Sequence, residues 1–158
     1  MFELLDRSTL RDLPDAALID ALEHRTRAEA TEAAARLAII AEVVARHCDD
    51  EASAHQVIDG WECAAAAVSA ACNLTRGAAS TQMRIAQALS ERLPKVAAMF
   101  DRGEVSAKII STITWRTQLI IDLDALALID TALAGAASTY GALSATKAEQ
   151  AIDVWVEK

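Results

Sequence analysis

Apolar residues recur at helical spacing along most of the chain. Between residues 15 and 47 no glycine or proline interrupts the pattern, and steps of three and four residues place apolar side chains on one helical face. That face consists of Leu18, Leu22, Ala33, Leu37, Ile40 and Val44. The pattern therefore predicts a long helix over about 15–47, roughly 50 Å in length. We expect Asp12 to cap it and Pro14 to lie in its first turn.

The middle of this helix, Glu23–Glu32, is polar and only weakly patterned. A helix segment without an apolar face gains little from packing on a core. Two arrangements stay open: this part projects from the body of the protein, or it packs against a partner chain.

Shorter helices are predicted over the rest of the chain, after an acidic connection from Asp49 to Gly60. They are Trp61–Cys72, a helix capped by Thr75 that runs to about Arg92, Lys95–Arg102 ended by Gly103, Ala107–Leu119 capped by Ser106, Leu123–Tyr140, and a last helix from Ser144 or Thr146 through Trp155. The segment Ile109–Trp115 is rich in β-branched residues and would suit a strand. Helix is preferred because no partner strand is apparent, so the sequence predicts an all-α helical bundle with a long N-terminal helix.

Two of the predicted helices meet at a short turn after Cys72. The apolar side chains of the second helix are expected to point inward: Ala79, Met83, Ala86 and Leu89. Its polar and basic side chains follow at steps of four, four and three residues, which place them on one face: Arg76, Ser80, Arg84 and Gln87. A pair of helices joined in this way resembles a helix-turn-helix, in which the second helix contacts DNA.

Gly77 lies in the first turn of this second helix, where glycine costs roughly 1 kcal/mol relative to alanine. One interpretation is a close helix–helix contact or a relaxed first turn. The other is clearance for a backbone or a phosphate beside the free N–H groups of the helix N-terminus. The first interpretation is preferred.

Composition supports helices throughout. Hydrophobic residues make up 53% of the 158 residues, and the chain has 36 alanines but only five glycines and two prolines. Alanine loses no side-chain entropy in a helix, and so few turn residues argue against a β-sandwich. The length suits one domain, residues 1–158, with the bundle over about 61–158. The last helix has no stop signal before Lys158, so we expect an N-terminal part of a longer protein.

The chain is acidic, with a net charge of −8, but the charge is uneven. Residues 73–116 contain seven Lys or Arg against three Asp or Glu, and both flanking regions are acidic. A local basic region suits phosphate binding, which adds Arg92, Lys95 and Lys108 to the candidate contacts. Ordinary variation among solvated surfaces would give the same imbalance, and that interpretation stays open.

No catalytic, cofactor or metal motif is recognised. His24, His47 and His55 lie outside any HExxH pattern, and the chain has no nucleophile elbow or glycine-rich phosphate loop. A set of His47, Cys48, His55 and Cys63 has no common zinc spacing. No catalytic residue, metal or cofactor is therefore predicted.

Other residues bear on location and packing. The three cysteines lack CxxC spacing, which favours a reduced, cytoplasmic protein. The uncharged runs are shorter than the ~20 residues of a membrane span, and the N-terminus lacks the pattern of a signal peptide. The three tryptophans, Trp61, Trp115 and Trp155, are expected to be core or interface anchors.

Several short motifs resemble a known family by their order. They are CNLTRGAA at residues 72–79, IAQAL at 85–89, RLP at 92–94 and FDRGEVS at 100–106. Together they resemble the actinobacterial 13E12 repeat family, whose best-known members are mycobacterial. Its members share an N-terminal domain of unknown function, and many continue into a C-terminal HNH endonuclease domain. The resemblance covers most of residues 15–158 and implies that any HNH motif lies beyond Lys158, so no catalytic residue is carried over.

The leading hypothesis is a DNA-binding or DNA-positioning module for an HNH-type nuclease. Its base-facing residues would be Arg76, Ser80, Arg84 and Gln87, with Arg92, Lys95 and Lys108 on phosphates. The alternative is a protein-interaction or homodimerisation module that uses the long helix and contacts no nucleic acid. An enzyme in its own right is the weakest of the three hypotheses.

Overall fold

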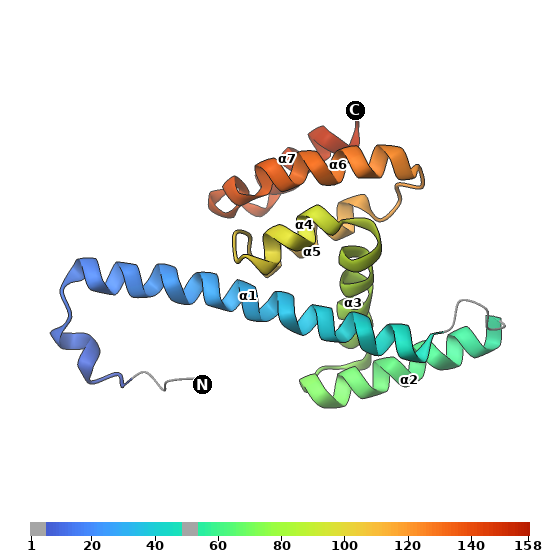
Figure 1. The fold of residues 1–158 in the computed structure, drawn as a ribbon, viewed down its shortest axis with the longest axis horizontal. Coiled ribbons are helices and arrows are strands. Elements are labelled where there is room, and N and C mark those ends of the chain that lie inside the picture. Colours follow the sequence, from blue (N-terminus) through green and yellow to red (C-terminus); the bar gives the residue numbers. More distant parts are fainter. Residues whose placement is uncertain (1–5, 49–53) are drawn as a thin grey trace.

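The computed structural model describes residues 6–48 and 54–158, and every regular element in these ranges is helical (Figure 1). The elements are the 3-10 turn η1 (Thr9–Asp12), α1 (Asp15–His47), α2 (Ala54–Cys72), α3 (Arg76–Gln87), the π-helical turn η2 (Ala88–Arg92), α4 (Pro94–Asp101), α5 (Ala107–Thr117), α6 (Leu123–Ala136), the 3-10 turn η3 (Ala137–Ala142) and α7 (Ala145–Val156). The predicted all-α fold is confirmed, and Ile109–Trp115 is helical within α5.

The long helix α1 has the predicted bounds, but its start is built differently. Asp12 does not cap it, because Asp12 ends η1 and the N-cap position belongs to Pro14, which offers no side-chain hydrogen bond. The proline itself is the reason. It holds Leu13 in an extended conformation with ψ 140°, and this keeps the helix from starting earlier.

The first half of α1 projects beyond the other helices (blue in Figure 1). This segment, residues 15–29, is named the arm, and none of its residues is buried. Its Ile19 and Leu22 are 55% and 62% exposed, so Leu22 does not belong to the core face predicted for it. The predicted projection of Glu23–Glu32 holds only in part, because Arg27 and Thr31 lie against Gly103 and Ala30 is buried.

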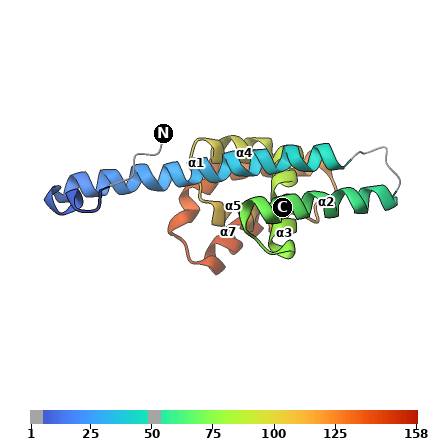
Figure 2. The same ribbon diagram turned by 90° about the horizontal axis from the view of Figure 1, so that it is seen from below.

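Helix α2 folds back along the second half of α1, as Figure 2 shows from another side. The predicted acidic connection is wrong over residues 54–60, which are helical, while residues 49–53 lie outside the described ranges. Gly60, the predicted end of that connection, lies within α2 and permits a close approach to α1. A Cβ at this position would lie 2.1 Å from the carbonyl oxygen of His47, so only glycine lets α2 pass the end of α1.

The turn between α2 and α3 closes as a Schellman motif. Asn73 has a positive φ of 52°, and the amide of Leu74 donates to the carbonyl oxygen of Ser69 at 3.0 Å. On the other side of the turn, Thr75 Oγ1 accepts from the amide of Ala78 at 3.1 Å. The predicted helix-turn-helix-like pair and its Thr75 cap are therefore present.

Beyond α3 the helices follow one another in the predicted order, but some begin or end at other residues than predicted. The last turn before Pro94 is a π-helix, since the amide of Leu93 donates to the carbonyl oxygen of Ala88. Gly103 ends the turn after α4 with φ +73°, and its Cα lies against Arg27 of α1. Ser106 caps α5 as predicted, and Ser144, one of the two residues predicted to begin the last helix, caps α7. The predicted helix Leu123–Tyr140 divides into α6 and η3.

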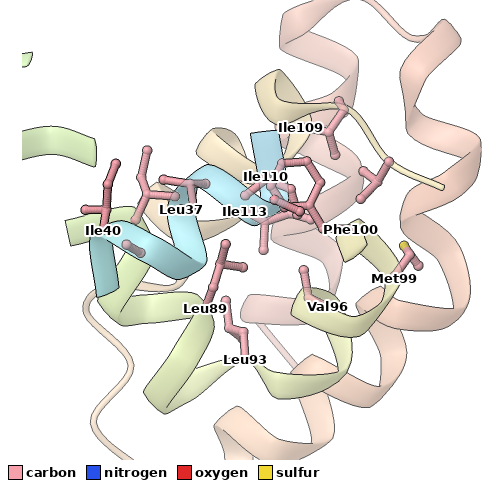
Figure 3. Packing of buried hydrophobic residues seen from close by; sticks show 14 of the residues in the cluster. Leu37, Ile40, Leu89, Leu93, Val96, Met99, Phe100, Ile109, Ile110 and Ile113 are labelled. Atoms are coloured by element: carbon pink, nitrogen blue, oxygen red, sulfur yellow. The ribbon is translucent and has the colours of Figure 1, made fainter. Parts of the chain in front are cut away.

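The core lies where α1, η2, α4 and α5 meet, and Figure 3 shows Leu37, Leu89, Phe100 and Ile113 converging there. All four predicted inward positions of the second helix are buried: Ala79, Met83, Ala86 and Leu89. Their short or flexible side chains let α3 pack against both α1 and α2.

A buried carboxylate joins α4 to α6. Asp130 of α6 is 2% exposed, and its two oxygens accept from the backbone amides of Lys95 at 3.0 Å and Val96 at 2.9 Å. These amides belong to the first turn of α4, whose own N-cap residue, Leu93, has no side-chain cap. Asp130 therefore caps α4 from a neighbouring helix.

Asp130→Ala is expected to lower the free energy of unfolding by about 2–4 kcal/mol, because two buried amides lose charged acceptors. Urea unfolding measures the change. Thr131→Ala is the matched control: Thr131 is exposed and accepts only from Lys95 Nζ, so its loss should stay within about 0.5 kcal/mol. Equal effects of the two substitutions would contradict the capping role.

Candidate functional site

The predicted polar face of α3 divides between two directions. Arg76 and Arg84 are exposed, but Ser80 is half-buried and its Oγ accepts from Trp61 Nε1 at 2.9 Å. Ser80 follows the fully buried Ala79 by one residue, a rotation of about 100°, which directs it to α2. The exposed residues of α3 include Arg76, Gly77, Thr81 and Arg84, and this surface is named here the outer face of α3.

Arg76 forms an ion pair with Glu62 of α2, with 3.3 Å between Nη1 and Oε2. Both side chains are more than half exposed, and such pairs contribute only about 0–1 kcal/mol. A phosphate would therefore displace Glu62 at little cost. Arg84 carries no ion pair or side-chain hydrogen bond within the described part of the chain, so its charge is available.

Two of the three predicted phosphate contacts have structural roles. Arg92 Nη2 donates to the carbonyl oxygens of Thr117 at 3.1 Å and Ile120 at 2.7 Å. These hydrogen bonds satisfy carbonyl groups at and just after the end of α5. Lys95 Nζ donates to Thr131 Oγ1 at 2.7 Å. Lys108 is exposed on the first turn of α5.

Acidic residues neutralise the remaining cations of the basic segment. Arg102 donates twice to Glu104, at 2.9 and 3.0 Å, and these hydrogen bonds lower the pKa of the Glu104 carboxyl. Arg116 pairs with Asp153 of α7. Within residues 73–116, four cations have no acidic partner in the described ranges. Arg84 and Lys108 have no side-chain hydrogen bond there, whereas Arg92 and Lys95 donate to neutral oxygens.

A surface groove of about 310 Å³ lies between α3 with η2 on one side and α5 on the other. It is named the α3–α5 groove. The α3 and η2 side contributes Thr81, Arg84, Gln87, Glu91 and Arg92, and the α5 side contributes Ser111, Thr114, Trp115 and Gln118. The groove therefore brings Arg84 and Gln87, two of the predicted site residues, beside an aromatic side chain that the prediction did not include.

Trp115 was expected to be an anchor, but it is 67% exposed. The periodicity of α5 carried a signal for it, because Lys108, Ser111, Trp115 and Gln118 share one helical face. The other two tryptophans are half-buried, as anchors are: Trp61 joins α2 to α3, and Trp155 Nε1 donates to Tyr140 Oη at 3.1 Å.

Gly77 faces open space, with no atom within 4 Å of a Cβ built at this position. The predicted helix–helix contact at Gly77 is therefore wrong. A relaxed first turn and clearance for a ligand both remain compatible with this position.

Among the side chains that the structure describes, no group of three or more His, Cys, Asp and Glu could hold a metal ion. His47 Nδ1 lies 2.8 Å from the carbonyl oxygen of Val43 in its own helix, and Cys63 is an exposed free thiol. The side chain of His55 lies outside the described part of the structure.

A profile of the family described as a domain of unknown function, DUF222, matches residues 24–158. The chain belongs to this family. The match begins within the arm and contains the whole of the helix-turn-helix-like pair, the α3–α5 groove and α7.

Relatives from Mycobacterium tuberculosis align with the entire chain. An uncharacterized protein in the est 3′ region is 47% identical over 160 residues, an alignment that covers 100% of this chain and 45% of that protein. The uncharacterized protein Rv3776 of strain ATCC 25618 / H37Rv is also 47% identical, with 31% of its length covered. The chain thus spans less than half the length of these relatives. No solved structure matches the chain.

Within the helices described for this DUF222 chain, none is both long enough and apolar enough to cross a membrane.

Ser80→Ala is expected to lower the free energy of unfolding by about 1 kcal/mol, because the half-buried indole N–H of Trp61 loses its acceptor. Chemical unfolding followed by tryptophan emission measures this. Thr81→Ala is the matched control, since the Thr81 hydroxyl bonds only to the carbonyl oxygen of Gly77 in its own helix. If Ser80→Ala leaves the free energy of unfolding unchanged, the hydrogen bond between Ser80 and Trp61 does not stabilise the fold.

Proposed function

We propose that this chain is a non-catalytic module that binds or positions DNA through the outer face of α3. The observation that carries the proposal is Arg84, an exposed cation without an ionic partner in the described ranges, on the second helix of a helix-turn-helix-like pair. Phosphate contacts of this kind supply most of the affinity of DNA-binding proteins.

Each element of the pair has a place in this proposal. Arg76 and Arg84 lie about 12 Å apart along α3, and the open position at Gly77 lies at the end of the helix where backbone N–H groups favour anions. Thr81 lies between them on the outer face. Arg92, first assigned to phosphates, holds the frame in place instead. Lys95 is exposed and donates to the Thr131 hydroxyl, and Lys108 provides a flanking charge.

A larger assembly follows from the resemblance to the 13E12 repeat family. We propose that the module precedes an HNH endonuclease domain in a longer cytoplasmic protein and brings DNA to that domain. The lengths of the mycobacterial relatives, of which the aligned region covers 31–45%, leave room for a further domain in those proteins.

A second candidate function is homodimerisation, and the projecting arm favours it. Ile19 and Leu22 are exposed there, one helical turn apart on the same face. Acidic Asp15 and Asp20 precede basic Arg25 and Arg27, so an antiparallel pairing of two arms would bring opposite charges together. Such a pairing is isologous, as two-fold symmetry requires.

The double substitution Arg76→Glu with Arg84→Glu is expected to abolish binding to a short DNA duplex, because it replaces two attractive charges by repulsive ones. Wild-type affinity, measured by fluorescence anisotropy, should fall between about 50 and 200 mM salt, with a slope of about 0.9 per phosphate contact.

Two matched variants sharpen this experiment. Arg46→Glu makes the same charge change as Arg84→Glu alone, on an exposed arginine of α1 that pairs with Glu42, and it should bind nearly as well as the wild type. Glu62→Gln releases Arg76 from its ion pair and should bind more tightly. Equal loss in Arg46→Glu and in Arg84→Glu alone would show that net charge, rather than this face, determines binding.

For the dimer, sedimentation over a range of concentrations should show self-association that persists at about 1 M salt, where DNA contacts are screened. Leu22→Glu should abolish it, because a charge cannot be buried unpaired between two arms. Ile39→Glu is the control, on an exposed residue of α1 outside the arm. A monomer at every concentration counts against the dimer.

A further inference from the structure

Trp115 is the side chain in the α3–α5 groove that the fold itself does not use. Its ring is largely exposed, and its indole N–H has no hydrogen-bond acceptor in the described part of the protein. Trp61 and Trp155, by contrast, both donate to protein oxygens. Burying an indole removes a large apolar surface from water, so a tryptophan left on the wall of a groove indicates a ligand.

The polar groups around Trp115 indicate which kinds of ligand the groove can bind. Gln87 and Gln118 carry both donors and acceptors, Glu91 accepts, and Arg84 is a free cation. A wholly apolar ligand would strip water from these groups without replacing their hydrogen bonds. The fitting ligand has a flat π surface, hydrogen-bonding edges and a nearby negative charge.

We propose that the α3–α5 groove binds one unpaired nucleotide, with its base stacked on Trp115; this rests on the proposed nucleic-acid function. The edge of the base is read by Gln87 and Gln118, an exocyclic amino group donates to Glu91, and a neighbouring phosphate pairs with Arg84. A base inside a duplex has both faces covered by its neighbours. The ligand is therefore a single-stranded segment or a nucleotide turned out of a duplex.

The groove is built to keep this geometry. Arg92 ties η2 to the carbonyl end of α5 at 2.7 and 3.1 Å, which fixes one wall relative to the other. The side chains Thr114 and Thr117 of α5 are buried, so the helix cannot rotate its Trp115 face inward without losing its packing. A preformed stacking surface binds a base without a conformational cost.

The test measures the affinity of the full chain for a fluorescein-labelled 20-nucleotide mixed-sequence single strand and for the duplex of the same sequence. Trp115→Ala should weaken single-strand binding about 5- to 150-fold, the range that corresponds to loss of one stacked base. Duplex binding should change less than about twofold. Trp115→Phe, which keeps a ring, should retain most of the affinity and lose the tryptophan quenching that accompanies binding in the wild type.

The controls separate this proposal from the one on which it rests. Leu119→Ala truncates an exposed apolar residue one turn beyond Trp115 and should leave single-strand binding near the wild-type value. An equal loss in Leu119→Ala and Trp115→Ala would show that exposed apolar surface in general, rather than stacking on Trp115, determines binding, and would overturn the proposal. If Arg84→Glu weakens duplex binding while Trp115→Ala changes nothing, the nucleotide site is wrong and the DNA-binding function stands. If neither form of DNA binds the wild type, both fail.

Discussion

The placement of three helices depends on the short segment that ends η2 and begins α4. Arg92 binds the last carbonyls of α5, Leu93 is fully buried, and the amides of Lys95 and Val96 bind Asp130 of α6. A buried carboxylate is costly unless its oxygens find donors, so α6 fits only where the first turn of α4 offers them. Pro94 places that turn, because its ring fixes the backbone at the start of a helix and needs no acceptor for an N–H group. The walls of the α3–α5 groove are separated by this junction rather than by contacts within the groove.

The same packing decides which charges are available for binding. The basic segment stands out in the sequence, but three of its arginines form ion pairs. Arg76 pairs with Glu62 of α2 and Arg116 with Asp153 of α7, both outside the segment. Arg102 pairs with Glu104 of the same segment. The cations of this segment without an acidic partner in the described ranges are Arg84, Arg92, Lys95 and Lys108, on an acidic protein. So small a set of cations favours a local contact with a few phosphates over broad electrostatic adhesion, because the rest of the molecule repels the polyanion. Recognition would then depend on the shape and polar groups beside Arg84.

Features determined by local chemistry could be predicted from the sequence. The bounds of α1, the caps Thr75, Ser106 and Ser144, and the inward face of α3 follow from capping groups and periodicity alone. Features that need a tertiary partner could not. Gly60 breaks no helix because its role is to admit the carbonyl of His47, and Ser80 turns inward because Trp61 of α2 lies beside it. Trp115 was expected to be an anchor because a large aromatic side chain is usually buried. In the fold its ring is exposed, since no other described element covers this part of α5. Of the candidate site, Arg84 and Gln87 were predicted, whereas Thr81, Ser111, Trp115 and Gln118 required the packing of α5 against α3.

The outer face of α3 and the α3–α5 groove share Thr81 and Arg84, and this constrains how a nucleic acid would lie. Gly77 and Arg84 are seven residues apart, about 10 Å along the helix axis, or roughly three phosphate steps of one B-DNA strand. Gly77 has open space above it at the end of α3 where N–H groups favour an anion, and Thr81 and Arg84 line the groove. In the proposed arrangement, a strand that passes from Gly77 over Thr81 would reach Arg84 with its next base beside Trp115. The backbone contacts of a helix-turn-helix and the stacking of a single base would then be successive parts of one path along Thr81 and Arg84.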